Sequence, residues 1–135
     1  MLMGLLFAGF LLAHGLIHVA FISPAPPVTA GGPAWPFATD QSWPVRALDI
    51  RPETVRILAK ALVALTVAGF ALAAVAALGG APGLWPPALA IGSIASVGIL
   101  ITFFHPWLSL GVAIDATLLW ATFIAGWVPA STGLG

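Results

Sequence analysis

Four long apolar runs divide the chain, separated by stretches that carry most of its proline and charge. A helix that crosses a bilayer needs about 20 mostly apolar residues, and each run is close to that length. In lipid only helices and closed barrels satisfy the backbone, and none of the runs alternates as a barrel strand does. The pattern predicts an all-α membrane protein, a single domain over residues 1–135 that forms an up-down bundle of four transmembrane helices. The predicted helices cover about residues 2–22, 54–78, 87–104 and 106–128.

The positions of proline agree with these boundaries, because all twelve prolines lie outside the predicted helix interiors, where they would break a hydrogen bond. The longest connection, residues 23–52, contains the pairs Trp35-Pro36 and Trp43-Pro44. Loops of this length are usually functional or disordered. Tryptophan favours the membrane interface, so we expect this loop to lie there. It would cap one end of the bundle, with Trp35 and Trp43 forming a lid.

The composition excludes several classes of protein. Apolar residues make up 61% of the chain and charged residues only 6%, whereas a soluble domain carries about 25% charged residues. The net charge is zero, which leaves no electrostatic footprint for nucleic acid. The chain has no cysteine and therefore no thiolate chemistry. The expected partner is the lipid bilayer, with a second copy or a larger membrane complex left open.

Charge is concentrated around the long loop. All the ionised side chains except Asp115 lie within residues 40–60, and the basic ones flank the loop. The positive-inside rule then places the loop in the cytoplasm and both termini outside. The first apolar run has no basic leader and no cleavage motif, which argues against a signal peptide. We expect a multi-pass protein of the cell membrane.

Ionisable residues inside the apolar runs are the candidates for chemistry. His14 and His18 lie four residues apart, hence on one helix face, where two imidazoles can bind one metal ion. Counted along the helices, Asp115 lies at the depth of His14, with Lys60 in the same half and His105 at its mouth. Such residues normally face the bundle interior and mark a site. Lys60 has a simpler explanation, since lysine near a helix end can extend to the interface.

Three interpretations of these residues remain open. His14 and His18 could bind zinc, copper, iron or nickel, with Asp115 or His105 as a further ligand. Haem fits less well, because two histidines on one helix face cannot bind opposite sides of its ring. The same residues could instead form a proton or small-ion pathway. They could also form a structural network, with Lys60 and Arg56 nearby, in an accessory subunit of a membrane complex. No catalytic motif decides whether the chain is an enzyme.

Several stretches resemble an uncharacterised family of small bacterial membrane proteins that carry HGLIH in the first helix. The resemblance covers most of the chain, although only the HGLIH run, which ends at His18, is distinctive. It implies a four-helix membrane protein and no particular activity. It also implies that an amide can replace Asp115, which favours a hydrogen-bonding role for that side chain over a metal-ligating one. The similar stretches are Ala13–His18, Trp35–Phe37, Ser42-Trp43, Ala61–Phe70, Phe104–Leu108 and Gly111–Asp115.

Overall fold

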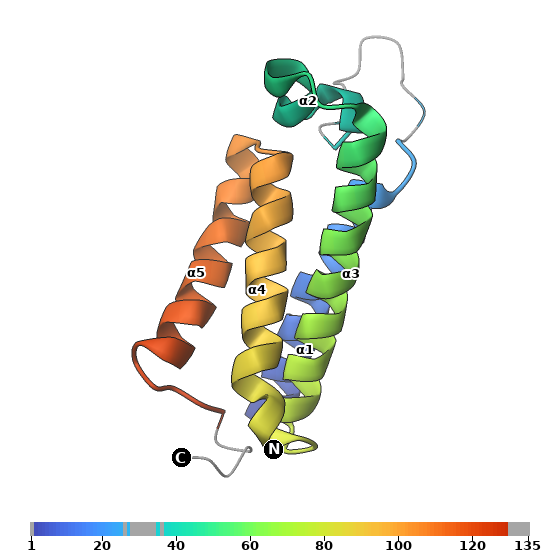
Figure 1. The fold of residues 1–135 in the computed structure, drawn as a ribbon. Coiled ribbons are helices and arrows are strands. Elements are labelled where there is room, and N and C mark those ends of the chain that lie inside the picture. The colour runs from blue at the N-terminus through green and yellow to red at the C-terminus, as the bar shows by residue number, and fades with distance from the viewer. Residues whose placement is uncertain (1, 26, 28–34, 36, 130–135) are drawn as a thin grey trace.

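The computed structural model describes residues 2–25, 27, 35 and 37–129. Within these residues the chain is helical and contains no strand. Four helical segments are long and apolar enough to cross a membrane, which confirms the four helices predicted from the sequence (Figure 1). The long helices, with the 3₁₀ turns that extend three of them, are α1 (Leu2–Ile17) with η1 (His18–Ile22), α3 (Pro52–Ala77), η3 (Pro82–Leu84) with α4 (Trp85–Thr102), and η4 (Pro106–Leu108) with α5 (Ser109–Phe123).

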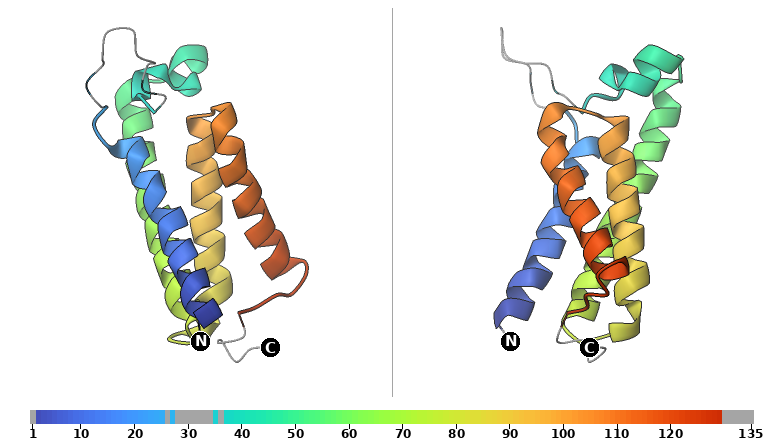
Figure 2. Two further views of the ribbon diagram at one scale, coloured as in Figure 1. Left: turned by 180° about the vertical axis from the view of Figure 1, so that it is seen from behind. Right: turned by 90° about the vertical axis from the view of Figure 1, so that its left-hand side faces the viewer.

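Helices α3 and α4 pack most closely, while α1 lies along α3 and α5 lies along α4 (Figure 2). The close approach of α3 to α4 depends on glycine. A Cβ atom built on Gly69 would lie 2.6 Å from the Cα of Gly92, closer than real side chains come. The absence of side chains at these two positions therefore brings the two backbones into direct contact.

The long loop contains a short helix that the sequence analysis did not predict. After a 3₁₀ turn, η2 (Thr39–Gln41), the chain forms α2 (Trp43–Leu48). Pro44 lies in its first turn, where proline is tolerated, and Asp49 ends it in the left-handed conformation. The indole N–H of Trp43 donates to the carbonyl of Ile101 over 2.7 Å and so ties α2 to the end of α4. The remaining parts of the predicted loop at residues 26, 28–34 and 36 lie outside the described residues.

The last helix is shorter than predicted, since α5 ends at Phe123 rather than near residue 128. Gly126 has a φ of 64°, which turns the chain away from the helix axis. The segment then packs back on the bundle, with the Trp127 ring 5.4 Å from Phe7 and 5.7 Å from Trp85 between ring centroids. Aromatic packing replaces the predicted final helical turn.

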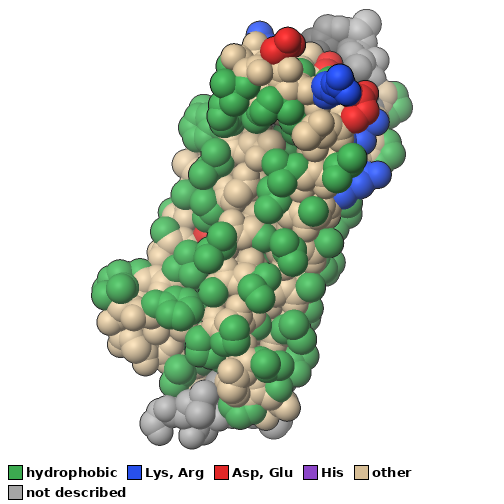
Figure 3. All heavy atoms as spheres, in the orientation of Figure 1, with side chains coloured by type: hydrophobic (Ala, Val, Ile, Leu, Met, Phe, Trp, Pro, Cys, Tyr) green, Lys and Arg blue, Asp and Glu red, His purple; other side chains and the backbone are tan. Residues whose placement is uncertain are grey.

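The two ends of the molecule differ in character. We call the end with α2, the start of α3 and the turn at residues 103–108 the charged end, because charged side chains gather there (Figure 3). Both chain ends lie at the other end of the molecule, the apolar end (Figure 1). Two hydrophobic clusters fill the interior. The apolar-end cluster includes Leu11, Phe70, Trp85 and Leu89, and the charged-end cluster includes Phe21, Val63, Ile99 and Phe103.

Candidate functional site

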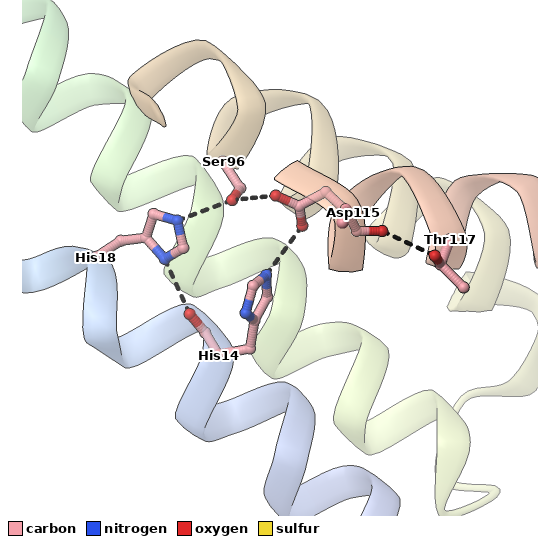
Figure 4. A network of polar contacts seen from close by, with 6 residues as sticks. His14, His18, Ser96, Asp115 and Thr117 are labelled. Carbon is pink, nitrogen blue, oxygen red and sulfur yellow. Dashed lines mark hydrogen bonds and ion pairs between the residues drawn. The ribbon is translucent and has the colours of Figure 1, made fainter. Parts of the chain in front are cut away.

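Three helical segments contribute to one polar cluster between the two hydrophobic clusters. His14 comes from α1 and His18 from the adjoining η1, while Ser96 comes from α4 and Asp115 from α5 (Figure 4). The Nε2 atom of His14 lies 3.0 Å from Oδ1 of Asp115. The Ser96 hydroxyl joins the other side of the cluster, 2.5 Å from Oδ2 of Asp115 and 2.8 Å from Nε2 of His18. Asp115 and His18 are thus connected through a single hydroxyl group.

A backbone contact orients His18. Its Nδ1 atom lies 2.9 Å from the carbonyl oxygen of His14, one turn earlier in the chain. A carbonyl can only accept a hydrogen bond, so Nδ1 of His18 carries a proton and donates it. The opposite ring nitrogen, Nε2, therefore points to Ser96 in a defined orientation. The turn from α1 into η1 places both histidines on the side of α1 that faces the cluster.

The cluster is almost completely shielded from the surroundings. Asp115 and Ser96 are 0% exposed, His18 is 1% exposed and His14 is 8% exposed. An isolated carboxylate in such a place would be strongly disfavoured, so its two hydrogen-bonded partners, His14 and Ser96, are necessary for it to remain there. The pairing of His14 with Asp115, which their equal depth predicted, is the sole ion pair found within the described part of the chain.

A cavity of about 300 Å³ adjoins the two histidines. It lies between the end of α1 and the first turns of α5, and Phe21, Phe37, Trp107 and other apolar side chains line it. His14 keeps one ring nitrogen, Nδ1, without a hydrogen-bond partner among the residues that the structure describes. His14 also lines this cavity. The cavity therefore provides an approach to the cluster from the charged end.

The other predicted site residues lie elsewhere. His105 stands before the turn at residues 106–108, where its Nδ1 accepts a hydrogen bond from the Trp107 amide over 3.3 Å. Arg56 and Lys60 line a separate cavity together with Trp35, one of the two predicted lid residues. The other, Trp43, packs on the end of α4 as described above. The described structure does not bring these side chains into the His14–Asp115 cluster.

Sequence reasoning missed Ser96. It interpreted Gly92 and Ser96 as small residues that permit close helix packing. That role suits Gly92, which lies against α3, but the Ser96 hydroxyl bridges Asp115 and His18. One signal was available, since Ser96 lies in the middle of its apolar run, as Asp115 does in the last one. Only the rotation of each helix about its axis could show that the two meet.

The donor atoms do not suit a transition-metal centre in this arrangement. Both ring nitrogens of His18 and the Nε2 atom of His14 already have hydrogen-bond partners, and a metal ion requires nitrogen lone pairs. Across the described residues, no group of three or more histidine, aspartate or glutamate side chains is placed to hold a metal ion. The geometry is that of a hydrogen-bonded chain that ends in two imidazoles.

Comparison with known proteins adds no family. The chain matches no family model, no curated protein and no solved structure. The resemblance through the HGLIH run therefore stays a prediction, and the site has to be interpreted from its own geometry.

Proposed function

We propose that this protein spans the cell membrane with its four apolar helices, and that the chain His14–Asp115–Ser96–His18 is a proton relay of a transport pathway. The observation that carries this proposal is the number of protons that the cluster needs. Chains of aspartate and histidine inside membrane proteins are typical of proton pathways. The up-down arrangement and the cytoplasmic position of the charged end are part of the same proposal.

The proton count follows from the four hydrogen bonds of the cluster. Each bond needs one proton between its two atoms. With Asp115 ionised and both imidazoles neutral, His14, Ser96 and His18 supply only three. The serine hydroxyl can then serve Asp115 or His18, but not both. One additional proton completes the network, and it also makes the cluster neutral overall, which favours its place in an apolar interior.

That additional proton has two positions. In one, His18 is an imidazolium that donates to Ser96, and Ser96 donates to an ionised Asp115. In the other, Asp115 is protonated and donates to Ser96, and Ser96 donates to a neutral His18. Two short proton movements along the same hydrogen bonds interconvert these states, and no heavy atom has to move. His14 can then accept a further proton at Nδ1 from the cavity and release one from Nε2 to Asp115.

The apolar end indicates how such a pathway would operate. Below the cluster, Leu11, Leu89 and Leu118 are among the buried side chains of the apolar-end cluster. This packing closes the route toward the apolar end, whereas the cavity opens toward the charged end. Net transfer across the membrane therefore requires the apolar end to rearrange, as in a transporter, rather than a permanently open channel.

The deciding experiment is proton flux into liposomes that contain the purified protein and a pH-sensitive dye, driven by a potassium gradient with valinomycin. Asp115→Asn is the critical variant. An asparagine can accept from His14 and donate to Ser96, so all four hydrogen bonds persist, but it has no exchangeable acid proton. We expect the wild type to conduct protons and Asp115→Asn to lose at least about tenfold of the flux while remaining folded, because the relay then lacks its acid.

Thr117→Ala is the matched control on α5, because the Thr117 hydroxyl bonds only to the Ala113 carbonyl of its own helix (Figure 4). Its flux should equal that of the wild type. Absence of wild-type flux, or equal flux in wild type and Asp115→Asn, would contradict the relay and leave the cluster as a structural network.

A further inference from the structure

We propose that a second site, the cavity formed by Arg56 and Lys60 of α3 together with Trp35, binds the phosphate group of an anionic phospholipid. This cavity has a volume of about 300 Å³ and lies at the charged end, between the segment that follows α1 and the first turns of α3. It shares no polar residue with the His14–Asp115 cluster, so the proposal does not depend on the proton relay.

The first argument is the unbalanced charge of this cavity. Arg56 and Lys60 are four residues apart on α3, hence on one face, and both line the cavity. Two like charges at this spacing destabilise a helix. Within the described part of the chain, neither forms an ion pair with a carboxylate. An anion bound between them would remove the repulsion.

The second argument is a hydrogen-bond donor without an acceptor. The indole Nε1 atom of Trp35 is buried and has no partner within the described structure. Buried N–H groups are nearly always bonded, so such an exception indicates a missing acceptor. Trp35 lines the same cavity as Arg56 and Lys60. A phosphate oxygen can accept from all three groups.

The third argument concerns the source of the phosphate. The wall opposite the cations is aromatic: the Phe37 ring lies 4.4 Å from Phe21 and 5.0 Å from Trp35 between centroids. Charged side chains gather at this end of the molecule, and hydrophobic side chains cover the face below them (Figure 3). A ligand at this border has an anionic head beside an apolar body, as an anionic phospholipid has. Basic pockets at the cytoplasmic side of membrane helices commonly bind such lipids.

The test is native mass spectrometry of the full chain released from nanodiscs that contain phosphatidylcholine with phosphatidylglycerol. We expect one phosphatidylglycerol molecule to remain bound in preference to phosphatidylcholine. In Arg56→Gln/Lys60→Gln this preference should fall about tenfold or more, since each basic group near an anionic lipid contributes on the order of 1 kcal/mol. Trp35→Phe, which keeps the ring and removes the N–H, should weaken the preference severalfold.

Arg46→Gln/Arg51→Gln is the matched control, because it removes the same charge from the same end without touching this cavity. It should keep the preference for phosphatidylglycerol. Equal loss in both double variants would show general electrostatic attraction and overturn the proposal. So would a wild type without preference. Displacement of the lipid by inorganic phosphate at equal concentration would assign the site to a soluble phosphate and overturn the lipid assignment. If Arg56→Gln/Lys60→Gln does not fold, unchanged selectivity in Trp35→Phe would overturn the site.

Discussion

The interior at the level of the His14–Asp115 cluster and the interior toward the apolar end are packed according to different rules. Toward the apolar end, α3 and α4 touch through the backbones at Gly69 and Gly92, and the neighbouring core is apolar. At the cluster, α1 and α5 are joined through polar side chains, and a cavity lies beside them. The comparison teaches that close packing holds the helices together where no chemistry is needed, while hydrogen bonds connect them where a proton can be held.

Two serines of α4 make the same contrast within one helix. Ser93 and Ser96 are both 0% exposed. Ser96 bonds to Asp115 and His18, whereas the Ser93 hydroxyl has no partner among the described residues. A buried hydroxyl is therefore not by itself a sign of a functional site in this chain. The bonded one is.

Removal of the carboxylate should break the polar side of this comparison most severely. Asp115→Ala leaves His14 and Ser96 without their acceptor and the additional proton without a counter-charge. We expect a loss of about 3–5 kcal/mol in the free energy of unfolding, the range for breaking a buried pair. Denaturant or thermal unfolding in detergent would measure it. Asp115→Asn should recover most of the loss, and equal destabilisation by both variants would mean that the charge, rather than the hydrogen bonds, holds the cluster.

An added methyl group tests the close-packed side. In Gly69→Ala the new Cβ atom would overlap the backbone of Gly92, so α3 and α4 would have to separate. We expect a loss of about 1–3 kcal/mol in unfolding free energy, the range for overpacked cores. Thermal unfolding in detergent measures the effect.

Gly9→Ala is the control for that variant, because a Cβ atom there has no neighbour within 4 Å. Alanine is the better helix former, so this variant should be unchanged or slightly more stable. Equal destabilisation by the two substitutions would contradict the importance of the α3–α4 contact.

The smallest effect should come from the two serines. Ser96→Ala removes the bridge between Asp115 and His18 and should lower the unfolding free energy by about 1–3 kcal/mol, toward the lower end because both partners keep one other bond. Ser93→Ala removes a hydroxyl without a partner and should be neutral or slightly stabilising. The difference between the two melting temperatures measures the value of the bridge. A difference of zero would contradict the hydrogen bonds of Ser96.

The four long helices were predictable because their cause is local. Length, apolar content and the position of proline act within each segment, and they determine where a membrane-length helix begins. The helix of residues 43–48 was missed because six residues surrounded by proline and charge give no periodic pattern. The early end of α5 was missed because it depends on aromatic packing of Trp127 against residues far away in the sequence.

The sequence by itself determined that this chain forms four apolar helices, that His14 and His18 share a face, and that Asp115 needs a partner. Spacing along one helix sets which residues share a face, but it does not set how that helix is rotated against its neighbours. Only the tertiary structure placed Ser96 between Asp115 and His18 and directed Arg56 and Lys60 to a separate cavity with Trp35. Rotation and depth follow from packing between helices, above all the backbone contact of α3 with α4. That packing exists only once the chain has folded.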